Sequence, residues 1–206
     1  MNIEFSPLCL GRLGESNLFN ELLNVCDSIH LDYMDGEFVP NEAFPIEHIN
    51  LFDSIKPIHV HLMCERPIDI AIQLKRFSTI SAHIETGINF QKFMEYMIIN
   101  NRDWGVVISP ETSIEKLSEL DYKPKRIILM AVTPGYSGQD FMKSTLKRII
   151  EIRKLFPNCD LVIDGGMNEE TIKSCYSLNA SSFVICTDLV RSNDRLAYVQ
   201  KLKNNI

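Results

Sequence analysis

Eight short apolar runs alternate with eight stretches of helical length, and this alternation limits the fold more than any other feature of the chain. The runs predict strands at 3–8, 28–34, 57–63, 79–85, 104–109, 126–132, 160–164 and 182–187. Helices are predicted at 15–26, 45–54, 67–77, 89–101, 113–119, 139–156, 168–177 and 194–204. Such alternation is typical of a parallel sheet covered by helices. Eight units in 206 residues fit a (β/α)8 TIM barrel, one α/β catalytic domain over 1–206, better than a doubly wound sheet.

Composition narrows the class of function. The net charge of −6 argues against a nucleic-acid-binding surface, and no apolar run reaches membrane-spanning length. We therefore expect neither nucleic acid nor membrane as a partner. The six cysteines are scattered without a CxxC pair, and the first residues lack the pattern of a signal peptide. These features predict reduced, buried thiols and a cytoplasmic protein.

The predicted strand 28–34 carries polar side chains on one face. Ile29 and Leu31 alternate with His30 and Asp32, so the two pairs project to opposite sides of the strand. A half-exposed strand with both polar side chains in water is one interpretation. A divalent metal ion is another, because polar groups on a buried strand need partners.

Other polar residues lie at the carboxyl ends of predicted strands, where the active site of such a barrel is found. His61 and Asp164 join His30 and Asp32 there. By itself, His61 would be interpreted as a core histidine and Asp164 as a turn residue. The four residues together predict a site for Zn²⁺, Fe²⁺, Mn²⁺ or Co²⁺. Two opposed carboxylates also suit proton transfer at the carbon next to a carbonyl, through an enediolate that the metal stabilises.

Glycine-bearing segments at the same rim predict a phosphate site. Gly135–Gly138 and Gly165-Gly166 each precede a predicted helix, and Cys186-Thr187 follows the last strand. Any one glycine pair is most simply a tight turn. Three segments near one rim favour an anion bound by backbone N–H groups.

These motifs together resemble the ribulose-phosphate 3-epimerase family over essentially the whole chain. They are HLDYMDGEFVPN at 30–41, HVHLM at 59–63, HIE at 83–85, TPGYSGQDF at 133–141 and DGGMNEET at 164–171. The resemblance implies a (β/α)8 barrel, in agreement with the eight units counted above. It also implies a homo-oligomer, since family members form dimers and larger assemblies.

The resemblance implies roles for individual residues as well. His30, Asp32, His61 and Asp164 fall on the metal ligands, Zn²⁺ first, and Asp32 and Asp164 also fall on the acid/base pair that inverts C3 of a ketose phosphate. We expect the substrate to contact Ser6, Met34, His61, Met63, Gly135, Tyr136, Ser137, Gly138, Gly165, Gly166, Cys186 and Thr187.

Two segments depart from the family pattern. Cys186-Thr187 stands where members have Gly-Ser or Gly-Thr, and Thr133–Gly138 stands where Asn-Pro-Gly-Phe-Gly-Gly is usual. Both concern the phosphate and the pocket shape, not the proton chemistry. We predict a 3-epimerase acting on a phosphorylated ketose, with D-ribulose 5-phosphate to D-xylulose 5-phosphate first. The alternatives are the same reaction on allulose 6-phosphate or a heptulose phosphate, a non-catalytic sugar-phosphate-binding barrel, and a metal-dependent decarboxylase.

Overall fold

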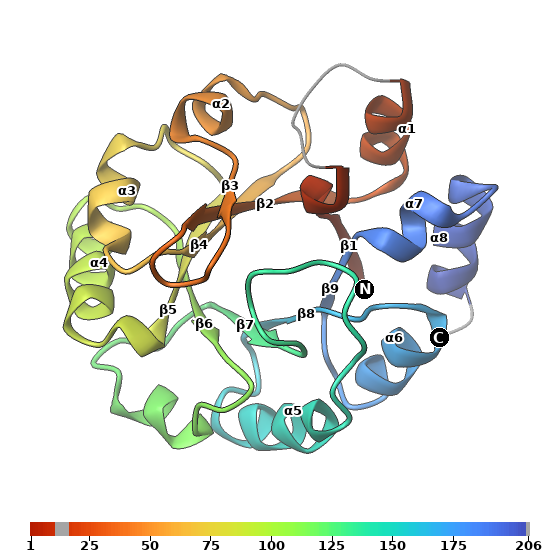
Figure 1. The fold of residues 1–206 in the computed structure, drawn as a ribbon. Coiled ribbons are helices and arrows are strands. Elements are labelled where there is room, and N and C mark those ends of the chain that lie inside the picture. Colours follow the sequence, from red (N-terminus) through yellow and green to blue (C-terminus); the bar gives the residue numbers. More distant parts are fainter. Residues whose placement is uncertain (11–16, 205–206) are drawn as a thin grey trace.

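The computed structural model describes residues 1–10 and 17–204, and its strands form a closed barrel surrounded by helices (Figure 1). Hydrogen bonds from β1 to both β9 and β2 close the ring, and every neighbouring pair in it is parallel. The ring contains, in order, β1 (Asn2–Phe5), β2 (Ser28–Asp35), β4 (Ile58–Met63), β5 (Thr79–His83), β6 (Trp104–Ile108), β7 (Arg126–Met130), β8 (Asp160–Asp164) and β9 (Ser182–Ile185). The predicted (β/α)8 barrel is confirmed.

The helices lie outside the strands, and a short extra strand, β3 (Glu42–Ala43), pairs antiparallel with the end of β2. The α-helices are α1 (Asn17–Val25), α2 (Ile46–Leu51), α3 (Pro67–Gln73), α4 (Ile88–Ile99), α5 (Ser144–Leu155), α6 (Glu169–Tyr176), α7 (Thr187–Arg191) and α8 (Arg195–Asn204). The 3-10 helices are η1 (Pro7–Leu10), η2 (Ile84–Thr86) and η3 (Ile114–Glu119). None of the described helices is long and apolar enough to cross a membrane.

Several predicted strands run too far at the barrel mouth; the strands expected to reach residues 85 and 132, for example, end at His83 and Met130. The strand expected to reach residue 8 ends at Phe5, and Pro7 begins η1, because proline has no N–H with which to continue a strand ladder. The strand expected to reach residue 187 ends at Ile185, and Thr187 already begins α7. In the first and the last strand, the prediction thus included residues that turn across the barrel mouth.

Several predicted helices also differ; those expected at 45–54 and 67–77 already end at Leu51 and Gln73. The segment expected to be an α-helix at 113–119 is η3, a 3-10 helix, which is common for pieces this short. The helix expected from residue 139 begins at Ser144, because Met142 N–H still bonds to the carbonyl of Ala131 beyond β7. Residues 15 and 16 of the first predicted helix lie outside the described residues.

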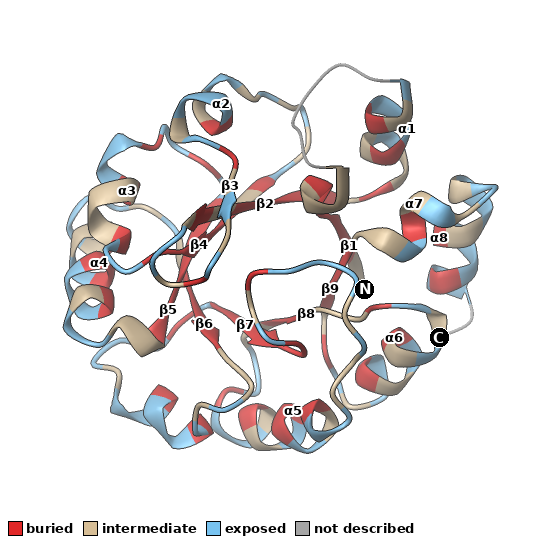
Figure 2. Cartoon of the chain, in the orientation of Figure 1, coloured by how far each residue is buried: buried red, intermediate tan, exposed pale blue. Residues whose placement is uncertain are grey.

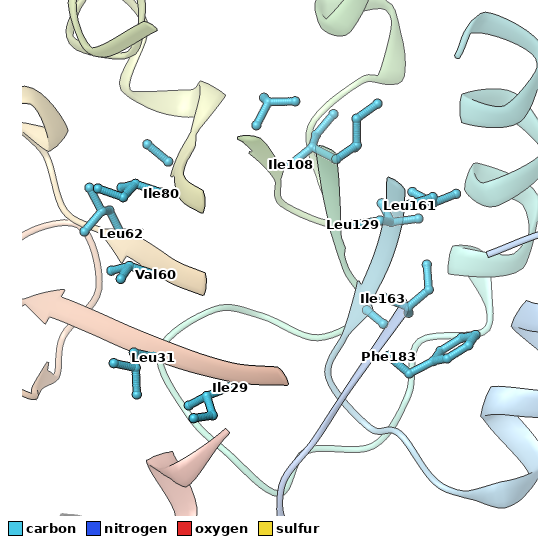
Figure 3. Close-up of a cluster of buried hydrophobic side chains, with 14 of the residues drawn as sticks. Ile29, Leu31, Val60, Leu62, Ile80, Ile108, Leu129, Leu161, Ile163 and Phe183 are labelled. Carbon is cyan, nitrogen blue, oxygen red and sulfur yellow. The ribbon is translucent and has the colours of Figure 1, made fainter. Parts of the chain in front are cut away.

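Alternation along the strands separates the hydrophobic core from the site. Ile29 and Leu31 of β2 are buried between the barrel and the helices, where burial is concentrated on the strands and the inner helix faces (Figure 2). His30 and Asp32 lie on the opposite face of β2 and point into the barrel. Figure 3 shows this outer core layer, with Ile29, Leu31, Val60, Leu62, Ile80, Ile108, Leu129, Leu161, Ile163 and Phe183.

Candidate metal centre and active site

Four of the predicted residues meet at the carboxyl end of the barrel. His30 and Asp32 come from β2, His61 from β4 and Asp164 from the last position of β8. The β2–β4 register places Asp32 beside His61. One ligand atom from each of the four residues lies within 4.8 Å of the others.

The separations within this cluster fit a single metal ion. His30 Nε2 lies 3.5 Å from Asp32 Oδ1 and 3.6 Å from Asp164 Oδ2, and His61 Nδ1 lies 3.2 and 3.6 Å from the same oxygens. The two ring nitrogens are 3.4 Å apart. Ligands bound at 2.0–2.2 Å around a tetrahedral ion are separated by roughly 3.3 to 3.6 Å. Two imidazoles and two carboxylates suit a first-row divalent ion.

The close packing of imidazoles and carboxylates shifts the pKa values of the residues in this cluster. Burial by itself would lower the pKa of His30, but the carboxylates of Asp32, Glu4 and Asp164 raise it to about 10. Burial would raise the pKa of Asp32, but the His30 and His61 imidazoles hold it well below its usual range. The neighbouring carboxylates also raise the pKa of His61 against the effect of its burial. The surrounding carboxylates thus favour positive charge at this point, which is also the condition for binding a cation.

The second ring nitrogen of each imidazole, the one that faces away from the cluster, contacts a further polar side chain. His30 Nδ1 lies 3.1 Å from Glu4 Oε2 on β1. His61 Nε2 lies 2.9 Å from His83 Nε2, and the other ring nitrogen of His83 lies 3.0 Å from Glu85 Oε2. The sequence did not predict Glu4, although its place in β1 gives it the same inward direction as Ser6.

Ser6 orients one of the two candidate acid/base groups. Its hydroxyl donates to Asp32 Oδ2 at 2.7 Å, which leaves Oδ1 directed at the imidazoles. Ser6 is buried in the turn between β1 and η1, whereas the sequence analysis placed it inside the first strand. The carboxylate thus has one oxygen for the cluster and one beside the pocket.

A cavity of ≈ 320 Å³ opens above the cluster. Eleven expected substrate contacts line it with Asp32 and Asp164, namely Ser6, Met34, Met63, Gly135, Tyr136, Ser137, Gly138, Gly165, Gly166, Cys186 and Thr187. His61 does not line it, because this side chain is fully buried beneath the floor. The sequence analysis did not assign other lining residues to the pocket, among them Leu8 of η1, Gln139 and Asp140 of the loop after β7, and Asp188 and Arg191 of α7.

The glycines after β8 are required by close packing between loops. Gly165 and Gly166 have φ of +109° and +65°, which favour glycine. A Cβ on Gly165 would lie 2.3 Å from a methyl carbon of Val132, and one on Gly166 would lie 2.5 Å from the backbone nitrogen of Phe141. The backbone of this loop therefore forms part of the pocket wall where no side chain fits.

Comparison with known proteins identifies the family. The profile of the ribulose-phosphate 3 epimerase family matches residues 3–190. The chain belongs to the ribulose-phosphate 3-epimerase family. It is 32% identical to ribulose-phosphate 3-epimerase of Aquifex aeolicus over 86% of this chain and 84% of that protein, and 30% identical to that of Chlamydia muridarum over 84% and 82%. The protein is therefore an epimerase.

Solved structures show the same barrel at low sequence identity. Orotidine 5'-monophosphate decarboxylase from Sulfolobus solfataricus superposes with a TM-score of 0.69 at 13% identity, over 100% of this chain and 97% of that one. At this identity the similarity shows the fold alone. The reaction class of this epimerase comes from its family.

The expectation of six reduced cysteines in this epimerase is wrong for two of them. Cys9 and Cys186 form a disulfide between η1 and the residue before α7. They are 177 residues apart, and only the pairing of β1 with β9 brings the two turns together. Sequence spacing therefore carried no sign of the bond. The free cysteines are Cys26, Cys64 and Cys175, which are buried, and the partly buried Cys159.

Proposed function

We propose that this epimerase inverts C3 of a phosphorylated ketose and interconverts D-ribulose 5-phosphate and D-xylulose 5-phosphate. The observation that carries the proposal is the pair of carboxylates, Asp32 and Asp164, at the floor of one cavity with two imidazoles beside them. Family membership supports the reaction class, and the names of the relatives support the pentulose substrate.

Asp32 and Asp164 can reach a bound ketose from different sides. They stand on β2 and β8, which are separated in the barrel by β1 and β9. We assign one ionised carboxylate to remove the C3 proton, which is acidified by the neighbouring C2 carbonyl, and the other, protonated, to deliver a proton to the opposite face. One proton is taken up and one released, so C3 is inverted without net oxidation. The Ser6 hydroxyl keeps the Asp32 carboxylate in place.

His30 Nε2, His61 Nδ1, Asp32 Oδ1 and Asp164 Oδ2 are the atoms we assign to bind one divalent ion, with Zn²⁺ as the first choice. Such an ion supplies positive charge that stabilises the developing enediolate oxygens. The chain's contribution is to arrange four ligands from three strands before the substrate arrives.

We assign the phosphate to the glycine-lined side of the cavity. Gly135, Gly138, Gly165 and Gly166 all have positive φ, and their loops present backbone next to Thr187 at the start of α7. Backbone N–H groups in such turns bind anions without a large side chain. The remaining assigned contacts are Met34 and Met63 as an apolar wall, Tyr136 and Ser137 as hydroxyl donors, and Cys186.

The proposal includes one catalytic domain over 1–206, a cytoplasmic location and assembly with a second copy of the chain. The location is supported by a relative from Oryza sativa that is named as a cytoplasmic isoform of ribulose-phosphate 3-epimerase. Self-association is supported by large aliphatic side chains exposed on and near α2 to α4, namely Leu51, Ile55, Ile72, Ile88 and Ile99. Light scattering would test the assembly, and a mass equal to one chain would contradict it.

Exchange of the C3 proton with solvent tests the assigned roles. The metal-loaded protein and its Asp32→Asn and Asp164→Asn variants would be incubated with D-ribulose 5-phosphate in D2O and followed by proton NMR. Both variants should lose exchange by about 100-fold or more. Asp140→Asn is the matched control, because Asp140 lines the same cavity outside the cluster, and it should retain exchange. Full activity in either cluster variant would contradict the two-carboxylate mechanism.

A further inference from the structure

A buried ion pair lies inside the barrel beneath the proposed metal site. Glu4 of β1 is fully buried, and Arg126 of β7, three strands away round the barrel, is 5% exposed. Arg126 shares its strand face with Ile128 and Met130, which belong to the apolar cluster inside the barrel. Both charged side chains therefore project into the barrel interior and not toward the helices.

The contacts of Glu4 connect this ion pair to His30. Both carboxylate oxygens accept from Arg126 Nη2, at 2.6 and 2.7 Å, and Oε2 also lies 3.1 Å from His30 Nδ1. The other terminal nitrogen of Arg126 donates to Asp160, whose second oxygen accepts from Ser182. Glu4 is thus held between a fixed guanidinium and the rear nitrogen of a proposed metal ligand.

The fold by itself does not account for this arrangement. Burying charged groups costs several kcal/mol each, and replacing a buried ion pair by apolar residues is often neutral or stabilising. The neighbouring interior positions Val162 and Val184 show that the barrel accepts aliphatic side chains. A role in the site explains why a carboxylate is retained behind His30.

That role follows from the chemistry of the imidazole ring. A neutral imidazole carries one proton, and the nitrogen without it is the one that can bind a metal ion. We propose that Glu4 is a positioning residue, which accepts a hydrogen bond from Nδ1–H of His30 so that the unprotonated Nε2 faces the ion, and that Arg126 holds Glu4 in place. A carboxylate behind a ligating histidine fixes the orientation of the ring and strengthens it as a ligand. This inference rests on the proposed metal site.

The two proposed histidine ligands are supported differently. His61 meets another imidazole, that of His83, whereas His30 meets a carboxylate directly. Loss of the Glu4 charge should therefore affect the His30 side of the site and leave the contact between His61 and His83 in place. A glutamine at this position has nearly the same size, but its amide is uncharged and can turn its NH2 group toward Nδ1, which would favour the wrong tautomer.

Zn²⁺ affinity tests the inference without depending on activity. Metal-free wild type and Glu4→Gln would be titrated with Zn²⁺ in competition with a chromophoric chelator at neutral pH. The dissociation constant should rise about 10- to 100-fold in the variant. Asp27→Asn is the matched control, because Asp27 accepts from the backbone N–H of Ile3 next to Glu4 and pairs with Lys203, outside the contacts of Arg126 and His30, and it should bind Zn²⁺ like the wild type.

The possible outcomes separate the inference from the proposed function. A folded Glu4→Gln protein with unchanged Zn²⁺ affinity and only a lower melting temperature would show a structural role and overturn the inference alone. If the single variant does not fold, Glu4→Gln/Arg126→Met removes both charges together, and wild-type affinity in that variant would overturn it equally. A wild-type protein that binds neither Zn²⁺, Mn²⁺ nor Co²⁺ would instead refute the proposed metal site.

Discussion

Substituting alanine for Gly166 should displace the proposed phosphate loop and lower both stability and activity. The same substitution at a second glycine, Gly87, provides the comparison. The added Cβ would lie 2.5 Å from the Phe141 nitrogen and 2.7 Å from its Cα, about 1 Å closer than ordinary contact. Neither atom belongs to a flexible side chain, so one of the two loops must move. The φ of +65° adds a backbone penalty of about 1 to 3 kcal/mol.

Gly87→Ala measures a positive-φ backbone penalty without overpacking. Gly87 has φ of +57° and ψ of −116°, and its added Cβ would meet nothing within 4 Å. This variant should lose about 1 to 3 kcal/mol of stability with unchanged activity. Gly166→Ala should lose a further ~1 to 3 kcal/mol from overpacking. A loop displaced by about 1 Å should also lower kcat/KM by about 100-fold.

Thermal melting and steady-state kinetics on the two variants check this prediction. Near 200 residues, each kcal/mol corresponds to roughly 2 to 4 °C in Tm, so the two penalties are separable. The kinetic loss should fall mainly on KM, because the loop is assigned to the phosphate and not to the reacting carbon. If Gly166→Ala melts and turns over like Gly87→Ala, the close packing of this loop has no functional role and the reasoning fails.

Three further predictions concern the metal ion, pH and the disulfide. Chelation of the ion should abolish C3 exchange, and Zn²⁺, Mn²⁺ or Co²⁺ should restore it; exchange in a protein shown by mass spectrometry to be metal-free would contradict the site. The pKa of His30 is about 10 in the folded metal-free protein against 6.5 for the free side chain, so its stabilising contribution is complete below pH 6.5 and is lost as pH rises toward 10. Urea unfolding should therefore show a free energy of unfolding that falls as the pH rises through this range. An unchanged free energy of unfolding across that range would refute the assignment. Thiol titration of the denatured, unreduced protein should find four thiols among six cysteines, since Cys9 and Cys186 are paired; six would contradict the pairing.

Local patterns in the sequence were sufficient to predict the barrel and the proposed metal cluster. The strand expected at 160–164 has the same bounds in the structure, because Asp160 and Asp164 flank an apolar run that is buried on both faces. His30 and Asp32 were predicted from strand alternation, and the barrel rule for strand ends added His61 and Asp164. These signals lie within single elements or follow from one topological rule.

Features that depend on distant contacts could not be predicted in this way. The pairing of Glu4 with Arg126 joins β1 to β7, and the Cys9–Cys186 bond joins the first loop of the barrel to the last. Neither has a characteristic spacing, because barrel closure and not chain proximity brings the groups together. The ends of the first and last strands were predicted wrongly for a related reason. Apolar residues continue past each strand end, so the sequence pattern does not mark the point where the chain turns across the barrel mouth.

The proposed reaction can be followed by proton NMR of the metal-loaded wild-type protein with D-ribulose 5-phosphate in D2O. We expect loss of the C3 proton signal together with growth of D-xylulose 5-phosphate, at an enzymatic rate on the order of 1 to 1,000 per second. Slow exchange on this pentulose with rapid exchange on a six- or seven-carbon ketose phosphate would support the same C3 epimerisation but assign it to the longer substrate. Binding of these sugar phosphates without any C3 exchange would contradict the account.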